Sequence, residues 1–166
     1  MDPRPLLIDT LPFLSPRNAL DGLTPVLAER RVPGAPHAIG DIVAHLAFWQ
    51  HGFAGRCDGT PGPMPPSAAT GWPAPEPGAW DGLRQRFLDG LERVVALGAA
   101  GDQGRRLDPP IEIPPLADIT VGDVIVHVAS HNAYHLGQVV LLRQMLGAWP
   151  PPAGSYTGVQ CASSGV

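Results

Sequence analysis

TVGDVIVHVASHNAYHLGQVVLLRQMLG, residues 120–147, is the stretch that decides the fold. Its apolar residues recur at the i, i+3, i+4, i+7 spacing of an α-helix with one buried face. Thr120 and Asp123 have the spacing of a capping box, with Asp in place of Glu, and Gly147 suits the residue after the last turn. The pattern predicts one long helix that ends near Leu146.

Three further helical segments precede this helix. The same periodicity predicts helices over about 38–57 and 79–97, each with one apolar face. The first segment is short and irregular. It begins at Ser15, a good N-cap residue, and Pro25 is expected to split it into two short helices.

A proline-rich stretch of about twenty residues separates the second and third predicted helices. A connection of that length inside a compact domain is uncommon, and in a helical bundle it can carry the chain to the opposite end. We therefore expect an all-α fold, a four-helix bundle with a long Pro/Gly-rich crossover between helices two and three, which then run parallel. The length of 166 residues suits a single domain spanning 1–166.

Composition narrows the class of protein. The formal net charge is −4, and Lys and Arg nowhere form a run longer than two. Nucleic-acid binders usually carry a basic stripe, so we expect no nucleic-acid partner. Cys57 and Cys161 have no CxxC spacing, which excludes a zinc ribbon or a thioredoxin-type motif.

The chain shows neither a signal peptide nor an apolar run near the ~18 residues of a membrane span. We therefore expect a cytoplasmic protein with free thiols and no membrane partner. The composition leaves a homodimer open.

Three of the six histidines lie four residues apart on the predicted long helix. At about 100° per residue from Val121, the apolar stripe lies within roughly 60° of zero. His135 falls inside the stripe at about −40°, His131 at its edge at about −80°, and His127 outside it at about −120°. Burying imidazoles without partners costs several kcal/mol, and a metal ion shared by His131 and His135 would satisfy them.

A third ligand is expected from another helix, because three protein ligands with one open position characterise catalytic zinc sites. His45 lies at the margin of the apolar face of the second helix, close to Trp49, and can point inward. His37 is expected in a loop and His51 on the surface. Spacing alone leaves open an ordinary hydrogen-bonded histidine pair.

Two strings in the chain resemble signatures of a known family. HLAFW at 45–49, in a helix that begins HAIGD at 37–41, resembles the second-helix signature of the DinB-like (YfiT-like) superfamily of metal-dependent enzymes. HVASHNAYHLGQ at 127–138 resembles the last-helix signature of that family and is the more specific match. The resemblance covers about residues 15–150 and implies a four-helix bundle with a long crossover.

The resemblance places the three metal ligands of the family on His45, His131 and His135. Many members carry Arg after the last histidine, and this chain has Leu136, which puts in doubt the binding of an anionic group there. His127 matches a histidine outside the ligand set, with a role beside the ligands or in a pocket, or one of plain packing.

Four residues are candidates for positions beside the ligands or in the pocket: His127, Gln138, Asn132 and Trp49. Gln138 can hydrogen-bond a ligand or substrate, although a polar contact between helices is the commoner role of such a residue. Asn132 points inward and can anchor a histidine. Trp49 is more often a core residue than a platform for substrate. No carboxylate stands where a general base is expected, so the catalytic residues stay open.

Three functions follow as hypotheses. The resemblance implies a metal-dependent transferase that uses a low-molecular-weight thiol as cosubstrate. The alternatives are a hydrolase that uses metal-bound hydroxide, and a non-catalytic metal-binding protein of the stress response. Three imidazoles suit several divalent ions, of which Zn²⁺ or Ni²⁺ is expected here, and the expected partner is a small-molecule substrate.

Overall fold

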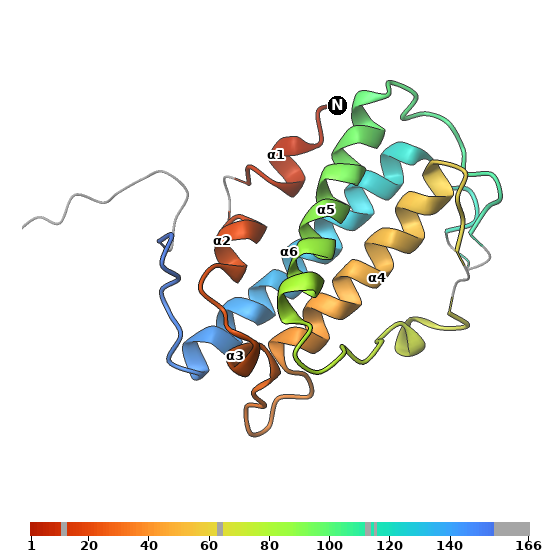
Figure 1. Cartoon of the computed structure of the whole chain (residues 1–166). Helices are drawn as coiled ribbons and strands as arrows, with labels where there is room; N and C mark the ends of the chain where they lie inside the picture. The colour runs from red at the N-terminus through yellow and green to blue at the C-terminus, as the bar shows by residue number, and fades with distance from the viewer. Residues whose placement is uncertain (11–12, 63–64, 112–113, 115, 155–166) are drawn as a thin grey trace, which may run out of the picture.

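Six α-helices make up the fold of the computed structural model, which describes residues 1–10, 13–62, 65–111, 114 and 116–154. They are α1 (Arg4–Leu7), α2 (Pro16–Leu20), α3 (Pro25–Glu29), α4 (Ile39–Cys57), α5 (Trp80–Ala99) and α6 (Val121–Met145), with a 3₁₀ turn η1 (Ala68–Thr70) (Figure 1). Within these residues there is no strand, only one isolated bridge between Arg106 and Thr120. The all-α prediction is confirmed.

The three long helices pack side by side, and the short ones take the place of a first long helix. Helices α1 and α2 pack on α5 and α6, whereas α3 packs on α4 and α5. The predicted split of the first segment at Pro25 is confirmed: Ser15 caps α2, Thr24 caps α3, and Pro25 is the first residue of α3. Helix α1 was not predicted from the sequence.

Helix α6 forms as its sequence predicts. The side chain of Thr120 accepts a hydrogen bond from the backbone N–H of Asp123, and the Asp123 carboxylate accepts one from the backbone N–H of Thr120. Gly147, two residues beyond the helix, has a φ of 69°, in the left-handed region that glycine adopts without strain. No helix of the described chain is long and apolar enough to cross a membrane.

Helices α4 and α5 run in the same direction. In Figure 1 the chain leaves the end of α4, returns along the outside of the bundle and enters α5 near the start of α4. Two contacts agree: Gln50 packs against Gly90 near the middle of both helices, and Asp58 after α4 pairs with Arg93 farther along α5.

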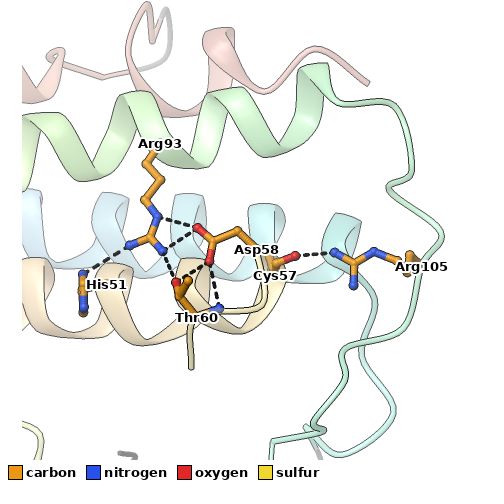
Figure 2. Close-up of polar contacts among 6 residues, drawn as sticks. All are labelled: His51, Cys57, Asp58, Thr60, Arg93 and Arg105. Atoms are coloured by element: carbon orange, nitrogen blue, oxygen red, sulfur yellow. Dashed lines mark hydrogen bonds and ion pairs between the residues drawn. The ribbon is translucent and has the colours of Figure 1, made fainter. Parts of the chain in front are cut away.

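A polar cluster fastens the end of α4 to α5 (Figure 2). The Arg93 guanidinium donates to Asp58 at 2.8 Å, to Thr60 at 3.0 Å, and approaches Nδ1 of His51 at 3.3 Å. Arg105 donates to the carbonyl of Cys57. His51 is exposed, as predicted, and the cluster fixes the point where the long connection begins.

A buried arginine on α6 links the ends of α2 and α6 at the other end of the bundle. Arg143 on α6 is 1% exposed and donates to the backbone carbonyls of Ala19, Asp21 and Ala148 at 2.8–3.0 Å. These carbonyls lie at the ends of α2 and α6, where backbone acceptors lack partners within the helix. Burial lowers the pKa of Arg143, an effect that the nearby Asp21 partly offsets.

Candidate metal centre

Three histidines from two helices converge inside the bundle. His45 comes from α4, and His131 and His135 from α6; one ring nitrogen from each lies within 4.8 Å of the others. His45 Nε2 is 3.1 Å from His131 Nε2. His45 and His135 are buried and His131 is half-buried, in the order that the helical angles predicted for the pair on α6.

The backbone of the connection orients His45. Its Nδ1–H donates to the carbonyl of Gly71 at 2.6 Å, so Nε2 is left as the ring atom that faces the other histidines. Gly71 reaches this position because it has no side chain. A Cβ there would lie 2.5 Å from Cζ2 of the Trp49 ring, a separation that real Cβ atoms do not show.

A side chain one turn away orients His135. Its Nδ1–H donates to Oε1 of Gln138 at 2.8 Å, which again leaves Nε2 facing the cluster. Histidines that bind metals usually donate their second N–H to an oxygen acceptor, which fixes both tautomer and ring direction. Two of the three rings carry this feature, and Gln138, expected beside the ligands, supplies one of the acceptors.

Trp72 was not predicted from the sequence and lies in direct contact with the cluster. Its ring stacks on His45 with centroids 3.7 Å apart and on His37 with centroids 3.9 Å apart. Trp72 is therefore held between two imidazoles, and His37, correctly expected outside a helix, lies next to the site. A bulky apolar residue in the proline-rich stretch was the available signal, because such residues seldom stay in solvent.

Burial keeps the histidines of the site neutral. Burial, together with smaller effects of the neighbouring His135 and His45, lowers the pKa of His131 to about 3. Burial is also the main cause of the lowered pKa of His45, His127 and His135, while hydrogen bonds to Gly71 and Gln138 partly oppose it for His45 and His135. The neutral imidazole is the form that binds a metal ion.

The other predicted residues have distinct positions. His127 is half-buried and stacks on His131 with ring centroids 6.1 Å apart, outside the three-histidine cluster. Trp49 belongs to the buried core, and its ring also meets the edge of His45. Tyr134, the residue before His135 and not among these candidates, is 68% exposed and packs edge-on against His135.

Asn132 differs from its prediction. It is 3% exposed, but neither its Oδ1 nor its Nδ2 has a hydrogen-bond partner in the described structure, so it anchors no histidine there. The physical reason is its position one residue after His131. A step of about 100° turns its side chain away from the line of the ligands and into the bundle interior.

A cavity of about 1000 Å³ opens onto the three histidines. Its wall includes the loop 33–37, Trp72 of the connection and one side of α6 from His127 to Met145. His127, Trp49 and Gln138 all line this cavity, whereas Asn132 is not among its lining residues. The cluster is therefore open to a small molecule on one side.

The three imidazoles fit a divalent cation. Nitrogen ligands about 2.0–2.1 Å from a tetrahedral zinc lie about 3.3 Å apart. His45 Nε2 and His131 Nε2 are 3.1 Å apart, and all three ligand atoms lie within 4.8 Å of one another. All three donors are uncharged nitrogens, which suits Zn²⁺ and Ni²⁺ better than Mg²⁺ or Ca²⁺. The cavity leaves room for a further ligand.

Comparison with known proteins identifies the family. The family model of the DinB superfamily matches residues 17–139, which is more than half of the chain. No curated protein and no solved structure matches the chain significantly. The matched region contains α4, α5 and all three clustered histidines. The chain belongs to the DinB superfamily.

Proposed function

We propose that the chain is a metal-dependent transferase that joins the sulfur of a low-molecular-weight thiol to an electrophilic carbon. The observation that carries the proposal is the convergence of three neutral histidines at one wall of a large open cavity. Zn²⁺ or Ni²⁺ is the proposed ion. When bound, it supplies a positive charge that lowers the pKa of a coordinated thiol and holds the sulfur in the cavity.

The residues of the chain contribute orientation. Gly71 and Gln138 hold the rings of His45 and His135 through Nδ1, so that Nε2 is the nitrogen left free to bind an ion. Trp72 limits the rotation of His45 further by stacking on its face. Preorganised ligands of this kind raise metal affinity, because less side-chain freedom is lost on binding.

The cavity lining favours a thiol over water as the nucleophile. Among the described residues that line it there is no Asp or Glu, so this wall provides no carboxylate general base. A free thiol has a pKa of about 8.5 and water one of about 15.7, so the thiol needs less help to lose its proton. A thiol-dependent reaction therefore does not require a general base on this wall.

The proposed reaction is a displacement. A bond forms between sulfur and the electrophilic carbon, the bond to the leaving group breaks, and the leaving group takes the electron pair. The thiol proton passes to solvent through the open side of the cavity. No oxidant or reductant is needed.

The test begins with the metal content of protein purified without added metal. The protein is then assayed with a panel of low-molecular-weight thiols and the electrophile monochlorobimane, before and after chelation and reloading with Zn²⁺ or Ni²⁺. We expect thiol-dependent turnover that chelation abolishes and reloading restores, and that is absent in His135→Ala. Hydrolysis of esters or amides without a thiol would contradict the proposal, and a metal-loaded protein without turnover would favour a non-catalytic bundle.

A further inference from the structure

Histidine is the one kind of acidic or basic side chain among the described residues that line the cavity. The described lining residues include no Lys, Arg, Asp or Glu, although the cavity measures about 1000 Å³. Charged groups are not scarce elsewhere: a second cavity of about 800 Å³, bordered by α4, α5 and residues 73–76, has Glu76, Arg86, Asp89 and Arg93 in its lining. The absence of charge is therefore a property of this wall and not of the whole molecule.

Large apolar side chains border the same cavity and are left in contact with solvent. Leu141 and Met145 on α6 are 55% and 56% exposed, and Tyr134 on the same side of the helix is 68% exposed. Single exposed apolar residues are ordinary, but three along one edge of a cavity form an apolar rim. An apolar molecule that entered the cavity would remove this rim from water.

The described wall offers no carboxylate, guanidinium or ammonium group to pair with a remote ionic group. A carboxylate moved from water into this cavity would lose hydration and meet no guanidinium or ammonium group on the described wall. A cation would likewise meet no carboxylate on the described wall, and His37 and His45 stack on the ring of Trp72. Only the group that reaches the three histidines would meet a charge, that of the bound ion.

We propose that the molecule held in this cavity is uncharged and largely apolar apart from the single group that reaches the histidines. The inference rests on the proposed function for the nature of that group, a thiol. It names a substrate class: small neutral molecules with an aromatic or aliphatic body. Peptide-like or dicarboxylic thiols with charges remote from the sulfur are excluded from the cavity.

Four ligands test the inference by calorimetric titration of the zinc-loaded protein. They are phenylmethanethiol, its para-carboxylate 4-(mercaptomethyl)benzoate, and the two corresponding alcohols. We expect the neutral thiol to bind at least tenfold more tightly than its carboxylate. Equal or tighter binding of the carboxylate, or no measurable binding of any of the four, would overturn the inference.

The alcohols separate this inference from the proposed function. If each thiol binds no better than its alcohol, the role of sulfur is refuted, while the preference for a neutral body is still read from the alcohol pair. The metal-free protein is also titrated with the alcohols, and tryptophan fluorescence monitors their binding. This second readout does not depend on the ion.

A matched pair of variants tests the wall itself. Leu141→Arg places a cation at the rim and should reduce the preference for the neutral thiol severalfold by improving binding of the carboxylate. Val126→Arg is the control, because Val126 is 47% exposed on the same helix and is not among the lining residues. An equal effect of both variants would show a general charge effect and would contradict the assignment to this wall.

Discussion

Replacing Gly71 by alanine should weaken metal binding without touching a ligand. The added Cβ would lie 2.5 Å from Cζ2 and 2.6 Å from Nε1 of Trp49, about 1 Å closer than ordinary contact. Trp49 is 7% exposed and packs on Phe53, so its ring has little room to yield. The backbone at position 71 must then move, and its carbonyl leaves the 2.6 Å hydrogen bond from His45.

The size of the effect follows from the lost hydrogen bond. Removing a partner that orients a metal-binding histidine costs about 10–100-fold in metal affinity, which corresponds to about 1.4–2.7 kcal/mol. The steric overlap should lower the free energy of unfolding by a further ~1–3 kcal/mol. The assay is a competition titration of Zn²⁺ against a chromophoric chelator, together with thermal unfolding of the metal-free protein.

The matched control is Gly137→Ala. Gly137 lies on α6 between the ligands and the helix end, and apart from its chain neighbours and the backbone of its own helix a Cβ there would meet nothing within 4 Å. Alanine should stabilise the helix by about 0.5–1 kcal/mol and leave metal affinity unchanged. If Gly71→Ala keeps the parental affinity while remaining folded, the argument that the Gly71 carbonyl orients His45 is wrong.

Three further predictions concern other parts of the chain. Arg143→Met should lower the free energy of unfolding by about 2–4 kcal/mol, because three backbone carbonyls lose their hydrogen-bond donor. The control Gln144→Ala, on the exposed side of α6, should change the free energy of unfolding by less than ~0.5 kcal/mol, and chemical denaturation measures both. The metal-free protein should lose stability as pH falls from 6.5 toward 3, because the folded chain, in which the pKa of His131 is lowered to about 3, does not take up the proton that the unfolded chain takes up. His131→Gln should lessen the dependence of the free energy of unfolding on pH, and a parent protein whose stability does not change with pH would contradict the prediction. Burial raises the pKa of Cys57 to about 11, so Cys57 should not react with a thiol reagent at pH 8 in the native protein. Labelling of Cys57→Ala, which keeps only Cys161, should then proceed as fast as labelling of the parent, and slower labelling of the variant would show that Cys57 is accessible.

The sequence was informative where regular periodicity decides the structure. Along α6 the apolar spacing, the cap at Thr120 and the glycine at 147 agree, and they predict both the helix and the inward direction of His135. His45 was found by the same reasoning on α4. The Ser15 cap and Pro25 also predicted α2 and α3, whereas α1 was missed, since a helix of one turn depends on packing against the rest of the bundle more than on its own pattern.

The surroundings of the histidines were only partly accessible from the sequence. Gly71 and Trp72 lie in an aperiodic connection, whose path depends on contacts between residues far apart in the chain. The prediction that Asn132 anchors a histidine was wrong for another reason. Its inward direction was correctly inferred, but direction alone does not say whether a histidine lies within hydrogen-bond distance.

The central claim, that three imidazoles from α4 and α6 hold one divalent ion, is tested most directly by X-ray absorption spectroscopy of the zinc-loaded protein. The structure predicts three imidazole nitrogens at about 2.0–2.1 Å and one further light atom, with one nitrogen lost in His45→Gln. A spectrum with fewer than three imidazoles, or one that is the same in parent and variant, would contradict it.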